Sequence, residues 1–113
     1  MELDSERRYA KRYDIRLPMR YRVSLKDSVP ISGSGSTCDL STTGVGFRCR
    51  RPLPVGAHIE LLVEWPARHG DADPLELQIT GFVTRNEAGR VGVRSTSRKF
   101  RVDTGVQSLL ATA

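Results

Sequence analysis

Apolar and polar side chains alternate along much of the chain, most regularly between residues 16 and 25. Every second position there is apolar: Leu17, Met19, Tyr21, Val23 and Leu25. Arginine, proline or serine occupies the positions between them, and this period of two predicts a half-buried β-strand. Pro18 fits the start of a strand, where its missing N–H is tolerated. The Gly/Ser/Pro-rich stretch that follows, Pro30 to Ser36, predicts a mobile loop.

A hairpin is predicted next, with Thr37 to Leu40 as its first strand and Val45 to Arg50 as its second. The second strand is expected to turn one set of side chains to the core and the other to solvent: Val45, Phe47 and Cys49 inward, Gly46, Arg48 and Arg50 outward. On the first strand the same parity places Cys38 and Leu40 on one face. It places Asp39 and Ser41 on the other face, away from the core.

Three more segments alternate in the same way, at residues 58–65, 75–85 and 90–95. Their expected core residues are Ile59, Leu61, Val63, Leu77, Ile79, Gly81, Val83, Val91 and Val93. Pro66 is expected to end the first of these strands, residues 67–74 to form a polar loop, and residues 86–89 to form a turn. Several short strands at this spacing predict a small antiparallel barrel or sandwich. Only the tail is typical of a helix, which Asp103 could cap.

Positive charge is concentrated near the N-terminus of a chain whose net charge is +5. The basic residues between positions 7 and 26 are Arg7, Arg8, Lys11, Arg12, Arg16, Arg20, Arg22 and Lys26. Only Asp14 opposes them. Such a basic segment attracts anions, but Arg16, Arg20 and Arg22 fit better on the solvated face of the first strand.

Other classes of protein receive little support from the sequence. The two cysteines, Cys38 and Cys49, and the two isolated histidines form neither a disulfide framework nor a zinc site. No nucleophile–base pair or pair of carboxylates at a catalytic spacing is present, so we do not expect an enzyme, a metal or a cofactor. The longest apolar runs fall far short of a membrane span, and no signal peptide is recognisable, so we expect a cytoplasmic protein without membrane insertion.

Two short motifs carry the chemistry. Arg8 and Arg12 form an RxxxR pattern, and residues 39–44 read DxSxxG. Arginine presents a planar fork of donors that fits phosphate oxygens or the O6 and N7 atoms of guanine. A carboxylate such as Asp39 can accept from guanine N1 and N2, and Ser41 can donate or accept beside it. Gly44 and Gly46 permit a positive φ or a close backbone approach at the turn.

In this order the motifs resemble those of the PilZ family of cyclic di-GMP receptors, across roughly residues 6–100. The resemblance rests on the segments 6–12 (ERRYAKR), 17–19 (LPM), 39–47 (DLSTTGVGF), 53–56 (LPVG), 81–83 (GFV) and 91–93 (VGV). Either motif alone is common, but the ordered pair separated by a strand is specific. From this resemblance and the pattern of strands, we predict one mainly β domain over residues 1–113. It would be an antiparallel barrel of about six strands with a flexible N-terminal arm and a short C-terminal helix.

The resemblance also implies the site. Arg8 and Arg12, on an arm spanning residues 7–15, would hold the ligand, with Asp39, Ser41 and Gly44 on its base. Gly46 lies in the same turn, and Arg48 lies close enough to be counted among the candidate contacts. In similar proteins an arginine directly before RxxxR, here Arg7, accompanies binding of an intercalated cyclic di-GMP dimer. We expect residues 1–6 and 111–113 to be disordered and the ordered arm to change a surface for an unidentified effector protein.

Two other functions remain open at this point. A PilZ-like adaptor could bind a protein partner and no nucleotide, but that function would be favoured by departures from the motifs, and there are none. A small basic barrel could also bind nucleic acid without specificity. The chain has few aromatic residues, and Phe47, Phe82 and Phe100 are scattered rather than interleaved with the basic positions, so we do not expect specific DNA or RNA binding.

Overall fold

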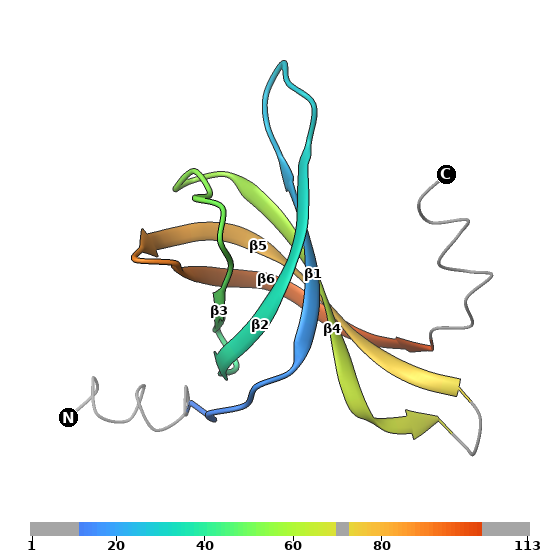
Figure 1. The fold of residues 1–113 in the computed structure, drawn as a ribbon. Helices are drawn as coiled ribbons and strands as arrows, with labels where there is room; N and C mark the ends of the chain where they lie inside the picture. The colour runs from blue at the N-terminus through green and yellow to red at the C-terminus, as the bar shows by residue number, and fades with distance from the viewer. Residues whose placement is uncertain (1–11, 70–72, 103–113) are drawn as a thin grey trace.

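Six antiparallel strands close into a barrel in the computed structural model, which describes residues 12–69 and 73–102 (Figure 1). The strands are β1 (Pro18–Ser24), β2 (Ile31–Leu40), β3 (Gly44–Arg48), β4 (His58–His69), β5 (Asp73–Glu87) and β6 (Arg90–Val102). Their order around the barrel is β1-β2-β3-β6-β5-β4, and β4 pairs back with β1. The predicted mainly β barrel is therefore confirmed. The helix predicted from Asp103 onward lies outside the described residues.

β1 has the strict alternation that the sequence predicts. Met19, Tyr21 and Val23 are buried, and the four positions around them are exposed. Pro18 is the first residue of the strand, where no ladder hydrogen bond needs its missing N–H. Leu17 and Leu25, one residue beyond each end, pack against the same core.

The loop predicted for residues 30–36 is wrong, because β2 begins at Ile31. The glycines of this stretch occupy positions opposite large side chains of β1: Gly33 pairs with Tyr21 and Gly35 with Met19. A Cβ on Gly33 would lie 2.5 Å from the Tyr21 hydroxyl oxygen. The absence of a side chain at Gly33 thus lets the Tyr21 ring lie over the strand, so a composition typical of loops here serves packing.

A bulge at Cys38 alters the predicted parity of β2. The register between β2 and β3 shifts between Thr37 and Asp39, and both Thr37 and Leu40 are buried. Cys38 therefore does not share the core face with Leu40, as the sequence had suggested, since the bulged residue interrupts the alternation. Asp39 remains on the outward face, opposite Gly46 on β3.

The strands β4, β5 and β6 are longer than predicted. β4 passes through Pro66 and continues to His69, with a register shift between Trp65 and Arg68 that accommodates a residue without an N–H. β5 begins at Asp73, so most of the polar loop predicted at 67–74 is strand. Of the turn predicted at residues 86–89, only Ala88 and Gly89 form the turn, with φ of 50° and 80°, because β5 continues to Glu87.

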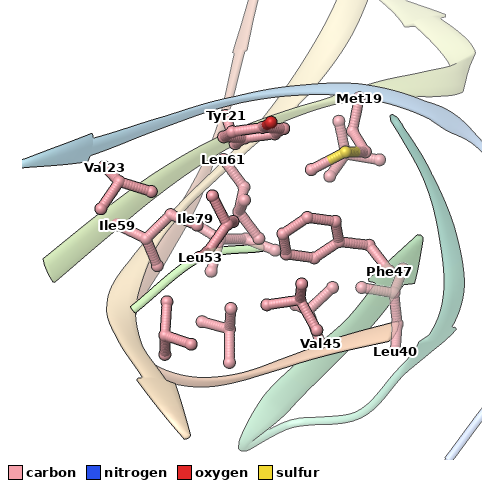
Figure 2. Close-up of a cluster of buried hydrophobic side chains, with 14 of the residues drawn as sticks. Met19, Tyr21, Val23, Leu40, Val45, Phe47, Leu53, Ile59, Leu61 and Ile79 are labelled. Carbon is pink, nitrogen blue, oxygen red and sulfur yellow. The ribbon is translucent and has the colours of Figure 1, made fainter. Parts of the chain in front are cut away.

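The barrel interior is filled by apolar side chains from all six strands (Figure 2). Phe47 of β3 is fully buried and packs 5.8 Å from the Tyr21 ring, centroid to centroid. Leu53, from the segment between β3 and β4, also enters this core, and its C=O accepts a 2.7 Å hydrogen bond from the Asn86 side chain. Burial of such side chains is the main driving force for folding. One face of each strand is therefore turned to the core, and only the other face can contribute to a site on the outer surface.

Candidate ligand-binding site

The turn between β2 and β3 is built around the hydroxyl of Ser41. Its Oγ accepts hydrogen bonds from the N–H groups of Gly44, at 3.1 Å, and Thr43, at 3.3 Å. The Ser41 N–H donates to the C=O of Gly44 at 3.0 Å, and the C=O of Thr43 accepts from the Ser95 N–H on β6 at 2.9 Å. The serine of DxSxxG therefore shapes the turn, as serine hydroxyls commonly do.

The two motif glycines matter because neighbouring atoms would crowd a Cβ at either position, not because they adopt an unusual φ. Neither Gly44 nor Gly46 has a positive φ. A Cβ on Gly44 would lie 2.7 Å from the Val93 carbonyl oxygen on β6, which excludes any side chain there. A Cβ on Gly46 would lie 3.0 Å from Oδ1 of Asp39. Gly46 thus lets the Asp39 carboxylate lie across the outer surface of β3.

Asp39 is only weakly held by its neighbours. Nη2 of Arg90 lies 3.7 Å from Oδ2 of Asp39, and the Arg90 side chain is 56% exposed. Exposed pairs of this kind contribute at most about 1 kcal/mol to stability. The carboxylate can therefore exchange Arg90 for the N–H donors of a ligand at little cost.

Backbone hydrogen bonds bring Arg12, the last residue of RxxxR, close to this turn. The Tyr13 N–H donates to the C=O of Leu40 at 2.8 Å, and the Leu40 N–H donates to the C=O of Tyr13 at 2.9 Å. Arg12 is exposed and directly precedes Tyr13, while Ser41 directly follows Leu40. In Figure 1 the segment that leads into β1 runs beside the end of β2. Arg7 and Arg8 lie outside the described residues.

A buried threonine fixes the next part of the same segment. Thr37 is fully buried, and its Oγ1 donates to the C=O of Ile15 and accepts from the Leu17 N–H at 2.8 Å. The Thr37 N–H donates to the C=O of Leu17 at 2.9 Å. Residues 13–17 are therefore attached to β2 at both ends. Nothing in the sequence marks Thr37, because its parity with Asp39 predicts the outward face. It is buried because the register of β2 shifts between Thr37 and Asp39.

Further arginines surround Asp39 that the motifs do not include. Arg48 is exposed and pairs in register with Arg90 on β6, so the two arginines are neighbours on the outward face. Gly46 pairs with Gly92, and Gly92 with Arg85 on β5. A Cβ on Gly92 would lie 3.3 Å from Nε of Arg85, so this guanidinium lies across the glycine. The alternation around Val91 and Val93 already implied that residues 90 and 92 face outward.

The site thus consists of one carboxylate beside a surface without side chains, bordered by guanidinium groups. Such a surface suits a flat ligand that carries N–H donors for Asp39 and anionic oxygens for the arginines. Burial raises the pKa of the Cys49 thiol above its ordinary value. Among the described residues, no group of three or more His, Cys, Asp or Glu side chains could hold a metal ion.

A small closed barrel with a carboxylate and arginines at one strand end suits a ligand-binding module. The sequence model of the PilZ domain matches residues 6–106, and the chain therefore belongs to the PilZ domain family. This is a family of receptor and adaptor modules that bind cyclic di-GMP in general. A comparison with curated proteins finds no significant match. No helix in the described part of the chain is long and apolar enough to cross a membrane.

Proposed function

We propose that this protein is a cyclic di-GMP receptor whose ligand lies between the RxxxR arm and the turn from β2 to β3. The observation that carries the proposal is the pair of backbone hydrogen bonds between Tyr13 and Leu40. These bonds hold Arg12 beside the DxSxxG turn, so two motifs 27 positions apart in the sequence become neighbours.

The ligand fits the chemistry of this surface. Cyclic di-GMP carries two phosphates and two guanines, and guanine N1–H and N2–H₂ can donate to the Asp39 carboxylate in place of Arg90. Arg8 and Arg12 would engage phosphate oxygens or guanine edges, with Arg48 as a further contact. Gly44 and Gly46 would let the guanine base approach the backbone, and Ser41 would keep the turn in shape.

Ligand binding would order the arm and so change a surface that an effector protein contacts. Residues 13–17 are already attached to β2, so the change would concern residues 7–12. Bound phosphates would neutralise the repulsion among Arg7, Arg8 and Arg12, which is how an anion orders an arginine-rich segment. Arg7 would take part in holding a second, intercalated dinucleotide.

Isothermal titration with cyclic di-GMP tests this function. Arg12→Ala and Asp39→Ala should each abolish measurable heat of binding while leaving the circular dichroism spectrum and the thermal unfolding midpoint nearly unchanged, because both side chains lie at the surface. Arg16→Ala is the matched control, since Arg16 is also an exposed arginine near the arm but belongs to neither motif. Unchanged affinity in Arg12→Ala would overturn the role of the arm.

A chain that binds no cyclic di-GMP at all would be a PilZ-like adaptor that recognises only protein. Titration of single-stranded RNA in parallel, at two salt concentrations, separates both functions from nonspecific nucleic-acid binding, whose affinity falls steeply with salt.

A further inference from the structure

β2 has neighbouring strands on both sides only in its second half. Residues 31–36 pair with β1, but pairing with β3 begins at Ser36, opposite Arg48. After Arg48 the chain turns away from β2, since the Cys49 N–H donates to the C=O of Gly89, on the β5–β6 turn, at 3.1 Å. In the described part of the chain, no strand pairs with the β3 side of residues 31–34.

Backbone groups of two serines face this open side. The Thr37 N–H donates to the C=O of Leu17, so Thr37 directs its backbone groups toward the side of β1. Because this direction alternates along an antiparallel ladder, residues 31, 33 and 35 also bond toward β1. Ser32 and Ser34 therefore present their N–H and C=O groups to the open side, and both residues are exposed.

A cleft of about 850 Å³ lies along this edge. Residues 32–36 of β2 form one wall, and Arg48, Arg50 and Arg51 contribute to the lining. All three arginines are exposed, and none of the residues that line the cleft is acidic. In Figure 1 the β1–β2 hairpin extends beyond the other strands, so a second chain could reach the start of the edge without passing the barrel.

We propose that this edge is a docking site for an extended, acidic segment of a partner protein, which adds to β2 as a further strand. Strand addition uses main-chain hydrogen bonds for affinity and alternate side chains for specificity. Ser32 and Ser34 supply the main-chain groups, and the small Gly and Ser side chains of β2 leave the approach open. The three arginines supply the complementary charge for aspartate or glutamate on the incoming strand.

The charge and the backbone chemistry disfavour two other occupants. A second copy of this chain, paired through the same edge, would bring two sets of Arg48, Arg50 and Arg51 together, and like charges across an interface are repelled. A nucleic acid would find the arginines, but its phosphates would also meet the C=O groups of Ser32 and Ser34, which only a donor can satisfy. An extended polypeptide carries both donors and acceptors along its backbone.

This docking site and the proposed dinucleotide site share only Arg48. Asp39 and the Tyr13–Leu40 bonds lie at the C-terminal end of β2, whereas the open edge lies in its N-terminal half. The inference therefore does not rest on nucleotide binding, and either site could fail its test while the other passes.

The test titrates the full chain with a labelled synthetic peptide in which valine and glutamate alternate, followed by fluorescence anisotropy. Amide hydrogen exchange by NMR reports on the edge at the same time. The acidic peptide should bind, its affinity should fall with salt, and exchange of the Ser32 and Ser34 amides should slow. A peptide of alternating valine and lysine is the control for charge and should not bind.

Variants of Ser34 and of the arginines distinguish the contribution of the backbone N–H from that of the positive charge. Ser34→Pro removes an N–H that the β1 ladder does not use and should weaken peptide binding by about tenfold or more, whereas Ser34→Ala keeps the N–H and should bind like the wild type. Arg50→Glu combined with Arg51→Glu should abolish binding without touching any strand. Binding by Ser34→Pro equal to that of Ser34→Ala, with the barrel spectrum intact, would overturn the proposal. Unslowed exchange at Ser32 and Ser34, or the same slowing by single-stranded RNA or by self-association, would also overturn it.

Discussion

The backbones of Tyr13 and Leu40 exchange two hydrogen bonds, of 2.8 and 2.9 Å, just where the N-terminal segment meets the end of β2. This bridge is isolated from the ladder between β1 and β2. It forms the base of the arm, because Arg12 precedes Tyr13 and the polar turn follows Leu40. The bridge therefore determines how far the arginines of the arm must reach to meet a ligand at Asp39.

Removing the bridge should weaken ligand binding more than it weakens the fold. Tyr13→Pro lacks the N–H that donates to Leu40, and the net loss of one backbone hydrogen bond costs only about 0.5–1.5 kcal/mol of stability. We expect the affinity for cyclic di-GMP to fall at least about tenfold, since the base of the arm is released. Titration calorimetry measures this change. Tyr13→Phe, which keeps the ring and the N–H, is the control, and equal affinities of the two variants would argue against the bridge.

Thr37 should prove to be a stability residue that also supports the site. Thr37→Val preserves the shape of the side chain but leaves the Leu17 N–H and the Ile15 C=O without their partner. An unsatisfied buried polar group costs about 1–3 kcal/mol, so the free energy of unfolding by urea should fall by about that amount. Thr37→Ser retains the hydroxyl and loses one methyl group, so its free energy of unfolding should fall by less than that of Thr37→Val. A larger loss in the serine variant would mean that packing, not hydrogen bonding, is what Thr37 provides.

The sequence predicted those parts of the fold in which alternation alone decides the structure. β1 and the core positions of β4, β5 and β6 follow the period of two, so they were predicted correctly. The N-terminal half of β2 was missed because its Gly and Ser residues are typical of loops. What makes it a strand is the Tyr21 ring on the neighbouring strand, which needs the space above Gly33. Such a tertiary reason has no signature in a local window.

The candidate site was predictable in part for a similar reason. Asp39, Ser41 and Gly44 belong to a motif that one hairpin turn holds together, so proximity along the chain places them correctly. Arg85 and Arg90 reach the same surface from β5 and β6 through the register of two further ladders. The alternation around Val91 indicated that Arg90 faces outward. Arg85 has the parity of the core residue Val83, and it reaches the outer surface only because the register shifts between Val83 and Arg85.

The two motif glycines should respond differently to alanine. In Gly44→Ala the new Cβ would meet the Val93 carbonyl oxygen at 2.7 Å, and the backbone of β6 would have to move. Overpacking of this kind typically costs about 1–3 kcal/mol of stability. In Gly46→Ala the Cβ meets only the Asp39 carboxylate, at 3.0 Å, which can rotate away. We expect the midpoint temperature of thermal unfolding to be lower in Gly44→Ala than in the wild type and nearly unchanged in Gly46→Ala.

Gly46→Ala, which should leave stability nearly unchanged, should nevertheless weaken ligand binding. Rotation of the Asp39 carboxylate in Gly46→Ala moves the acceptor for guanine, so the affinity for cyclic di-GMP should fall about tenfold, the value of one displaced hydrogen bond to a charged group. Unaltered affinity in Gly46→Ala would show that the position of Asp39 over β3 is not needed for recognition.

Arg7 should set the number of ligand molecules. With the wild-type chain, titration calorimetry at saturating cyclic di-GMP should give about two nucleotides per chain, because three neighbouring arginines can neutralise the phosphates of an intercalated dimer. Arg7→Leu should reduce the stoichiometry to one and leave Arg8 and Arg12 to bind the remaining molecule. A stoichiometry of one in the wild type would refute the role of Arg7.

Stability should decline at alkaline pH through Cys49 and Tyr21. Burial raises the pKa of the Cys49 thiol above its ordinary 9.0, and burial, followed by the nearby Cys49, raises that of Tyr21 above 10.0. A raised pKa means that the folded state favours the protonated form, so the unfolded chain releases its protons first as the pH rises. The contribution of Cys49 is therefore complete below pH 9.0 and is lost as the pH rises through the folded pKa.

Cys49→Ala removes this contribution, together with the part of the Tyr21 pKa shift that Cys49 causes. The difference in unfolding free energy between the wild type and Cys49→Ala, measured by urea titration at a series of pH values, should be constant near neutrality and should shift in favour of the variant above pH 9.0. The Sγ of Cys49 donates to the C=O of Arg51 at 3.0 Å, and this hydrogen bond needs the thiol proton. A difference that stays constant through the alkaline range would show that the thiol has the same pKa in the folded and unfolded chains.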